Sequence, residues 1–423
     1  MQREFDWESL PIVDIVNDII SDAISKHASD IHLDQKESNL LIRIRIDGEL
    51  INYTIAPAAV KKNLITRIKI IAGMNITDTR LPQDGAIKMT LNKELVDMRV
   101  SSLPTSYGEK VVVRILDYTR SLAGLDSLGF LKKNYDRVLK LMDIPNGIIL
   151  VTGATGSGKS TTVYSILQNL NTEDVNVITV EDPVEMRIEG INQVQVNHEI
   201  GLDFGNALRS ILRQDPDIIM IGEIRDDETA RIAVRASITG HLVLSTIHTN
   251  NSLNTVERLL DMDVERYLLG TALSGIISQK LARSLCNNCK RTRPSTDYEK
   301  GIFKIALKRD VPVIYEPIGC DQCRGGYSGR IAIHEVLIIN QEIRDAITNN
   351  VRKEELRKLI YSSDVTTMLQ DGLEKVVEGT TSFEEVLKLI DLDDDISSHD
   401  ENNLQIVLKD SVNSLQATEK FEI

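Results

Sequence analysis

The first 118 residues combine two spacings of apolar side chains. Residues 11–28 carry them at helical intervals that give one buried face, and a second helical pattern runs near 58–72. Strand-like runs occur at Leu40–Ile46, Glu94–Val100 and Lys110–Leu116. This mixture predicts a small α+β domain over residues 1–118. A polar, glycine-containing stretch at 119–129 is typical of a linker.

From about residue 130, short apolar runs alternate with helical patterns. The apolar runs are Ile148–Val151, Val175–Val180, Ile218–Ile221 and Leu242–Ile247. The helical patterns begin near Lys159, Phe204 and Asp227. Such alternation is typical of a parallel sheet flanked by helices, so we expect an α/β domain over residues 130–285. A cysteine-containing region at 286–330 and a helical extension at 331–390 come after it.

The chain has 423 residues and a formal net charge of −14, and this charge is uneven. Residues 391–423 hold nine carboxylates against two lysines, which is half of the net negative charge. We expect this acidic tail to be solvated and disordered, with a docking segment as the alternative. The remaining body is also acidic, which disfavours nucleic acid as a partner.

The amino-terminal residues lack the basic and apolar regions of a signal peptide. Apolar runs in the chain stay well short of the ~20 residues that a membrane-spanning helix needs. We therefore expect a cytoplasmic protein whose association with a membrane goes through partners.

Four cysteines form two C-x-x-C pairs, Cys286/Cys289 and Cys320/Cys323. In a reducing compartment two such pairs indicate a tetrathiolate zinc site rather than disulfides. Four thiolates leave no open coordination position, so the zinc would be structural. The 30-residue gap between the pairs is longer than in a minimal zinc ribbon, and independent reduced thiols are the alternative.

A glycine-rich loop of the pattern G-x-x-x-x-G-K-S follows the first apolar run of the α/β domain. Its small residues allow closely packed backbone N–H donors, while Lys159 suits the β- and γ-phosphates and Ser160 suits Mg²⁺. The sequence therefore predicts an ATPase. The expected ATP-binding residues are Gly153, Ala154, Thr155, Gly156, Ser157, Gly158, Lys159, Ser160 and Thr161.

Carboxylates end two further apolar runs. Glu181 and Asp182 lie where a carboxylate can orient or deprotonate the attacking water. We expect Glu181 to be catalytic, whereas Asp182 is as well explained by a turn. Glu223 ends another run, and we expect it to support Mg²⁺ together with Ser160, directly or through water.

His241 and His248 flank the apolar run Leu242–Ile247. A histidine beside a strand is often a hydrogen-bonded structural residue. Two of them around one strand, in a chain with seven histidines, favour a function. We expect them to sense the γ-phosphate rather than to bind zinc.

Three arginines of the first domain are candidates for a second kind of contact with ATP. An arginine offered to the γ-phosphate neutralises transition-state charge and couples hydrolysis to the position of a domain. Arg80, Arg99 and Arg114 could act in this way. Surface ion pairs are the alternative for each of them.

Taken together, these motifs resemble those of the motor ATPases of type II secretion and type IV pilus assembly. The resemblance covers roughly residues 10–390. Besides the nucleotide-site motifs it includes Ala28–His32, Arg80–Gly85, Leu103–Leu116, Gln279–Cys289 and Gly319–Arg330.

The resemblance implies a homohexameric ring whose subunits have a RecA-like P-loop domain preceded by the small α+β domain, with ATP between the two. It implies that Glu181 is the catalytic base, that Glu223 is the second acidic motif and that His248 belongs to the histidine motif. Arg99 and Arg114 would be arginine fingers. The ring would dock on an inner-membrane platform protein and power the assembly of pilins or pseudopilins.

Two features depart from the family's pattern. Typical assembly motors carry a further amino-terminal domain that binds cytoplasmic partners or, in some members, cyclic di-GMP. This chain begins directly at the second domain and is expected to be a short form, so those interactions are not carried over. The acidic tail at 391–423 also has no counterpart.

Three rival functions share much of this sequence pattern. A retraction motor has the same fold but usually lacks the cysteine pairs. A nucleic-acid translocase would use the same RecA-like core. A catalytically silent ring scaffold would not need Lys159, Ser160, Glu181 and Glu223 together.

Overall fold

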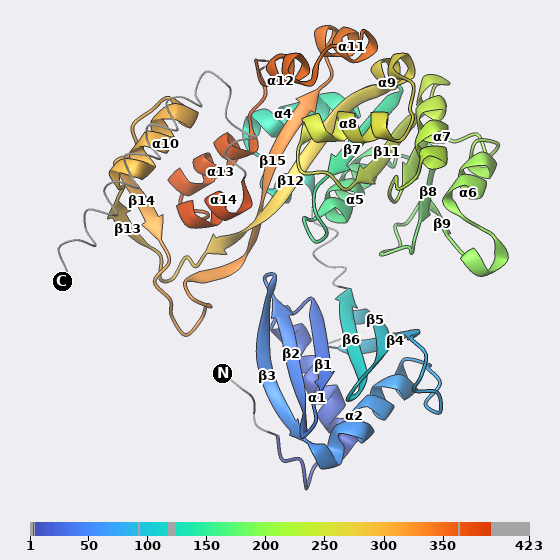
Figure 1. Ribbon diagram of the computed structural model, residues 1–423, viewed down its shortest axis with the longest axis vertical. Helices are drawn as coiled ribbons and strands as arrows, with labels where there is room; N and C mark the ends of the chain where they lie inside the picture. The colour runs from blue at the N-terminus through green and yellow to red at the C-terminus, as the bar shows by residue number, and fades with distance from the viewer. Residues whose placement is uncertain (1–2, 4, 92–93, 117–123, 363, 391–423) are drawn as a thin grey trace. The chain divides into compact units, whose positions relative to one another are not determined.

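The structure is a computed structural model that describes residues 3, 5–91, 94–116, 124–362 and 364–390 (Figure 1). The predicted tail at 391–423 and residues 119–123 of the predicted linker lie outside the described residues. The chain divides into two compact units, Met1–Arg120 and Ser121–Ile423, and each is described by itself.

The first unit is a six-stranded antiparallel sheet with two helices, as the α+β prediction requires. The strand order is β3-β2-β1-β6-β5-β4. Its elements are α1 (Ile12–Ser25), β1 (Asp30–Gln35), β2 (Asn39–Ile46), β3 (Glu49–Pro57), α2 (Ala58–Ile71), β4 (Gln83–Leu91), β5 (Glu94–Thr105) and β6 (Gly108–Leu116).

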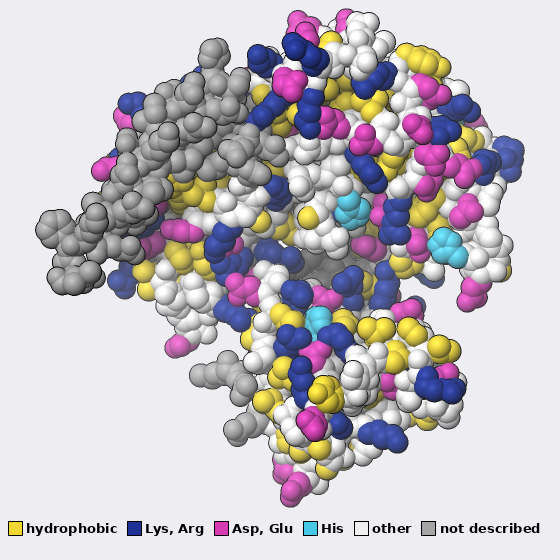
Figure 2. Space-filling view, in the orientation of Figure 1, with side chains coloured by type: hydrophobic (Ala, Val, Ile, Leu, Met, Phe, Trp, Pro, Cys, Tyr) yellow, Lys and Arg dark blue, Asp and Glu magenta, His cyan; other side chains and the backbone are white. Residues whose placement is uncertain are grey.

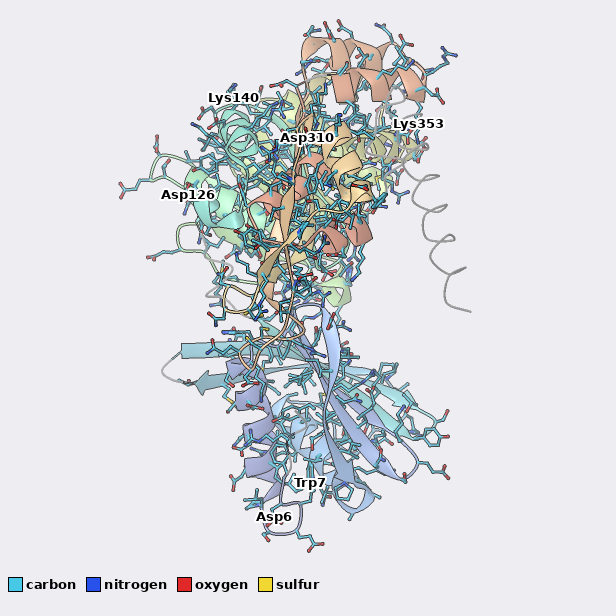
Figure 3. The ribbon with its side chains drawn as sticks, turned by 90° about the vertical axis from the view of Figure 1, so that its left-hand side faces the viewer. Asp6, Trp7, Asp126, Lys140, Asp310 and Lys353 are labelled. Atoms are coloured by element: carbon cyan, nitrogen blue, oxygen red, sulfur yellow. The ribbon has the colours of Figure 1, made fainter. Side chains whose placement is uncertain are left out.

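Alternation along the strands builds the core of this unit. In β2 every second side chain is buried, namely Leu40, Ile42 and Ile44. They belong to the same apolar cluster as Ile19 from the buried face of α1. Trp7, labelled in Figure 3, is partly buried against this cluster. One face of the sheet is therefore covered, and the other carries polar side chains.

The apolar pattern predicts α1, α2, β2, β5 and β6 but misses β1, β3 and β4. In β1 the reason is visible, because its buried positions include Asp30 and Asp34. Only Ile31 and Leu33 are apolar in β1, and two alternating apolar positions are too few to mark a strand.

The second unit contains a seven-stranded sheet, a two-stranded ribbon and helices on the faces of the larger sheet (Figure 1). Its strands are β7 (Gly147–Thr152), β8 (Val177–Glu181), β9 (Asn192–Gln195), β10 (Ile218–Ile221), β11 (Leu242–Ile247), β12 (Leu273–Leu285), β13 (Arg291–Pro294), β14 (Val313–Glu316) and β15 (Tyr327–Ile338). Its helices are η1 (Leu125–Leu128), α4 (Lys132–Met142), α5 (Lys159–Leu170), η2 (His198–Ile200), α6 (Phe204–Ile211), α7 (Asp227–Ile238), α8 (Ser252–Asp261), α9 (Arg266–Ala272), α10 (Asp297–Leu307), α11 (Gln341–Thr348), α12 (Lys353–Ser362), α13 (Met368–Val377) and α14 (Phe383–Leu389).

The order of the large sheet is β15-β12-β7-β11-β10-β8-β9, with β15 antiparallel and the others parallel. The four predicted central strands, β7, β8, β10 and β11, are buried along their whole length. Thr152 is in register with Ile247, and Ile221 is in register with Val180. Parallel pairing in this register brings the carboxyl ends of these strands to one edge, where an α/β fold binds its ligand.

Two long strands extend beyond this edge. β12 spans Leu273–Leu285 and pairs with β15 from Gly275↔Ile338 to Leu285↔Tyr327. The predicted boundary at 330/331 therefore falls inside β15. The cysteine region also contains the β13–β14 ribbon and α10, and the four helices α11 to α14 follow β15. Among the described residues, no helix has both the length and the apolar character to cross a membrane.

Candidate nucleotide site and cysteine cluster

The side chain of Lys159 folds back onto the phosphate-binding loop. Lys159 begins α5, and its ammonium donates to the carbonyl oxygens of Gly153 at 2.9 Å and Ala154 at 3.1 Å. Burial lowers the pKa of Lys159, while the carboxylates of Glu223 and Glu185 act in the opposite direction. The ammonium is therefore held over the loop, within the reach of a phosphate that would replace the two carbonyls.

The loop leaves room for a phosphate on one side and is packed on the other. A Cβ at Gly153 would lie 2.4 Å from the carbonyl oxygen of Gln279, whereas one at Gly156 would meet nothing within 4 Å. Ser157 Oγ is buried and has no hydrogen-bond partner among the described residues. The first N–H groups of α5 also lack intrahelical partners, as at any helix start. This donor set fits a polyphosphate.

Gln279 of β12 holds the loop from the neighbouring strand. Its amide donates to the carbonyl of Ser157 at 2.7 Å, and its side-chain oxygen accepts from Thr162 Oγ1 at 2.8 Å. The side chain is 1% exposed. Gln279 therefore connects the loop to α5 and to β12. The sequence motif for phosphate binding does not include it, and only its place in the Gln279–Cys289 resemblance could have pointed to it.

Glu181, the last residue of β8, is 3% exposed and accepts three hydrogen bonds. One carboxylate oxygen accepts from the Tyr164 hydroxyl, and the other accepts from Thr179 Oγ1 at 2.6 Å and Gln193 Nε2 at 3.1 Å. Burial and the carboxylate of Glu181 raise the pKa of Tyr164 far above its ordinary value. The carboxylate is thus rigidly oriented. Among the described residues, Oε2 accepts from Tyr164 alone, so its second lone pair is the one that a water could use.

Glu223 and His248 come together at the carboxyl edge of the sheet. His248 Nε2 lies 3.4 Å from Glu223 Oε2, and Arg225 pairs with the other oxygen. The Glu223 side chain is 14% exposed and that of His248 is 48% exposed. The hydrogen bond to Glu223 raises the pKa of Arg225. Both oxygens of Glu223 therefore have a partner, and a directly bound Mg²⁺ would share its oxygen with Arg225 or His248.

The loop that carries His248 is attached to the end of β7. The Thr152 hydroxyl donates to the Thr249 carbonyl at 2.8 Å and accepts from the Thr249 N–H at 3.2 Å. Thr249 Oγ1 also contacts Thr255 Oγ1 in α8 at 2.6 Å. The phosphate-binding loop follows β7, and the histidine loop follows its neighbour β11. The hydrogen bonds of Thr152 connect the two.

The structure does not bring His241 to this group. Gly147, which begins β7, donates its N–H to the His241 carbonyl at 3.2 Å, and the register of β7 with β11 puts both at the amino-terminal edge of the sheet. His241 Nδ1 lies 2.8 Å from the carbonyl oxygen of Ala236, at the end of α7. A strand of this length separates it from His248 by roughly 20 Å, at about 3.3 Å per residue. Its position is that of a structural histidine.

Arg99 and Arg114 are cross-strand partners in the first unit, on β5 and β6. Arg114 Nε donates to Asp30 Oδ1 at 2.9 Å, and its side chain is 62% exposed. Arg80 is 88% exposed and lies 3.8 Å from Asp78. The structure thus shows an ion pair for Arg114 and for Arg80. The role of any of these arginines as a finger stays a prediction.

The four cysteines converge although they come from two distant segments. Their sulfur atoms all lie within 4.8 Å of one another, with 3.5 Å between Cys289 and Cys323 and 4.0 Å between Cys286 and Cys320. Four sulfurs around a tetrahedral zinc at about 2.3 Å would be about 3.8 Å apart. The Gly319 N–H donates to Cys289 Sγ at 3.3 Å. The cluster therefore fits zinc, bound by Cys286, Cys289, Cys320 and Cys323.

A family model described as "Type II/IV secretion system protein" matches residues 6–388 of this chain. The chain belongs to this family. The match covers both units, so the family includes the α+β sheet as well as the nucleotide-binding sheet.

Within the family, the chain is similar to proteins of secretion and of pilus assembly. It is 44% identical over 383 residues to the type II secretion system protein E of Aeromonas hydrophila, covering 90% of this chain and 76% of that protein. It is 43% identical to the type IV pilus assembly ATPase PilB of Acinetobacter baylyi, covering 90% of this chain and 66% of that protein. These relatives bear out the resemblance to secretion and pilus-assembly ATPases.

Among solved structures, the pilus retraction motor PilT with bound ADP is similar at a TM-score of 0.61 and 28% identity. The similarity covers 90% of this chain and 97% of that one. The family's fold, an α/β nucleotide-binding domain preceded by a smaller domain, is therefore the fold of this chain.

Proposed function

We propose that this chain is a homohexameric motor that hydrolyses ATP to power the assembly of a type IV pilus or of a type II secretion or competence pseudopilus. Its membership of the secretion family, whose members include named ATPases, makes it an ATP hydrolase. The observation that carries the proposal is the grouping of Lys159, Glu223 and His248 at the carboxyl edge of one sheet.

The phosphate-binding loop supplies the ATP site. Lys159 would exchange the carbonyls of Gly153 and Ala154 for the β- and γ-phosphates, and Gln279 keeps the loop in place while it does so. Ser160, the second residue of α5, and Glu223 would hold Mg²⁺. Bound Mg²⁺ neutralises the charge that develops on the phosphates.

Glu181 and His248 would act on the attacking water and on the γ-phosphate. We keep Glu181 as the catalytic base, since its carboxylate is fixed in orientation by three donors at the end of β8. His248, half exposed and paired with Glu223, would sense the γ-phosphate. Arg99 and Arg114 are proposed as fingers from the first unit.

Zinc in the cysteine cluster would be structural. The four sulfurs leave it no open coordination position, and backbone N–H groups such as that of Gly319 support the thiolates. The cysteine pairs and the 43% identity to an assembly ATPase favour an assembly motor, whereas the retraction motor matches at 28% identity.

The proposed partners are other copies of the chain and an inner-membrane platform protein, with pilins or pseudopilins reached indirectly. The platform would keep this cytoplasmic ring at the inner face of the membrane. Nucleic acid is not an expected partner. On the face in Figure 2 basic side chains are interspersed with acidic ones, and the chain as a whole carries −14.

Mg²⁺-dependent ATP hydrolysis, measured with light scattering of the same sample, tests the proposal. Turnover by a hexamer that Lys159→Ala and Glu223→Ala both abolish is the expected result. A folded hexamer that stays inactive with the platform's cytoplasmic domain added would support a silent scaffold instead. Hydrolysis that depends on added DNA would indicate a translocase.

A further inference from the structure

Glu335 is a buried acid that the proposed mechanism does not use. It lies in β15, is 0% exposed, and is paired in register with Ser278, which is paired in turn with Thr152 at the end of β7. A carboxyl group in such a position is expensive unless it makes a specific contact. Burial raises the pKa of Glu335, while its hydrogen bonds with Ser252 and the charge of Lys280 act in the opposite direction.

The specific contact is with the start of α8. Glu335 Oε1 accepts the backbone N–H of Ser252 at 3.1 Å, and Ser252 Oγ lies 3.2 Å from Ser278 Oγ. Ser252 is the first residue of α8, where backbone N–H groups lack a partner within the helix. Glu335 thereby satisfies a donor that would otherwise be buried and unpaired, since Ser252 is also 0% exposed.

Two further contacts hold the segment between β11 and α8, one near each end. Asn251 caps α8 by accepting the N–H of Asn254 at 2.9 Å, and Thr249 is bonded to Thr152. Only four residues separate β11 from α8, and the first of them is His248. Because Thr249 Oγ1 also contacts Thr255 Oγ1 in α8, a shift of the start of α8 would pull on the Thr249–Thr152 bonds and displace His248, the residue before Thr249.

We propose that Glu335 is a positioning residue that fixes the start of α8 to the sheet and so holds His248 against Glu223. The inference rests on the proposed role of His248 in ATP hydrolysis. It assigns a function to a residue outside the nucleotide-site motifs, and it predicts which atom matters. The acceptor oxygen is required, and the negative charge is not.

Two pairs of variants separate the contact from general packing. Glu335→Gln keeps an acceptor oxygen for Ser252, whereas Glu335→Leu removes it. Ser252→Pro deletes the donor N–H at the first position of a helix, where proline is well tolerated, and Asn251 already has the extended backbone that precedes proline. Ser252→Ala is its comparison, because it keeps the N–H and removes only the hydroxyl, which lies 3.2 Å from Ser278 Oγ.

In ATP hydrolysis by the full chain, Glu335→Leu and Ser252→Pro should lower kcat about tenfold with KM changed less than about twofold, as expected for a displaced group. Glu335→Gln and Ser252→Ala should stay within about threefold of the wild type. Adding Glu335→Leu to His248→Ala should cause no further loss. Independent, multiplying losses would overturn the proposal, as would a glutamine variant as slow as the leucine one.

Hydrogen exchange of the backbone amides at 248–255 tests the proposal even in a protein that does not hydrolyse ATP. Glu335→Leu should accelerate exchange in this segment, and Glu335→Gln should not. Unchanged exchange in the leucine variant would refute the positioning role even if the wild type hydrolyses ATP. A wild type without turnover but with the expected exchange pattern would instead count against the proposed ATP hydrolysis and leave the positioning role intact.

Discussion

His248 Nε2 lies 3.4 Å from a carboxylate oxygen of Glu223, although the two side chains follow different strands of the sheet. Both strands, β10 and β11, are parallel neighbours in register, so their carboxyl ends deliver the pair to one place. The remaining oxygen of Glu223 is paired with Arg225. The pair is therefore the point where the acidic motif and the histidine motif of this chain meet.

Removal of this imidazole should affect the chemical step more than binding. We expect His248→Ala to lower kcat about tenfold and to change KM for ATP less than about twofold. His241→Ala is the matched control, because His241 lies at the opposite edge of the sheet, and it should keep kcat within about twofold. Steady-state hydrolysis measures both. Equal losses in the two variants would contradict the assignment.

The two hydrogen bonds of Gln279 predict a binding defect. Gln279→Ala leaves the buried carbonyl of Ser157 without its donor, at a cost of about 1–3 kcal/mol, and loosens the loop. We expect affinity for ATP to fall about tenfold in titration calorimetry. Gln370→Ala removes a glutamine that caps α13, away from the loop, and should leave affinity unchanged. A normal affinity in Gln279→Ala would show that the loop holds its shape alone.

The sulfur cluster predicts one zinc ion per chain in elemental analysis. Cys289→Ser should release the metal and lower the unfolding temperature by on the order of 10 °C, because metal binding contributes to folding. Asn287→Ser, which changes an exposed residue between Cys286 and Cys289, should retain both zinc and stability. Four freely reactive thiols in a protein without metal would instead support independent reduced cysteines.

The ion pairs of Asp34 should make the stability of the first unit sensitive to acid. Burial alone would raise the pKa of this carboxyl, but hydrogen bonds from Lys110 and Arg43 outweigh it and hold the pKa below its ordinary value. Because the pKa is lower in the folded state than in the unfolded state, the ion cluster stabilises the unit at neutral pH. That contribution is lost as the pH falls from about 4 through the folded-state pKa.

Asp34→Asn should therefore lower the unfolding temperature at neutral pH. The difference in unfolding temperature between the variant and the wild type, called the gap below, should narrow toward about pH 3. Thermal unfolding over this range tests the sign. Glu37→Gln, at an exposed position two residues after β1, is the control and should not change the profile. A gap that widens on acidification would mean that the carboxylate does not stabilise the unit.

Much of the nucleotide-binding sheet could be predicted because its elements are locally marked. The strands β10 and β11 have the bounds that their apolar runs predict, and α6 and α7 begin after capping aspartates, Asp203 and Asp226. The histidines show the limit of this reasoning. Both histidines flank one strand, but the direction of the strand separates them. His248 follows β11 at the carboxyl edge, where an α/β fold binds its ligand, and His241 precedes β11 at the other edge.

The groups that hold the site in place could not be predicted in this way. Gln279 and Glu335 come from strands far along the chain, and only the pairing of β7, β12 and β15 brings them to the phosphate-binding loop and to α8. Local patterns also gave no sign that Glu181 would be buried under three donors. Side-chain partners of this kind depend on sheet order, which apolar spacing does not encode.

The paired strands β12 and β15 connect the nucleotide site to the cysteine cluster. Gln279 and Glu335 lie near the middle of this pair, which ends at Leu285 and Tyr327, next to Cys286 of the sulfur cluster. Backbone pairing continues between these positions with one register shift, between Arg283 and Leu285, so a tilt applied at the cysteine end would act on both residues through the same two strands. Any such tilt would move Gln279, which holds the phosphate-binding loop, and Glu335, which holds the start of α8, at the same time.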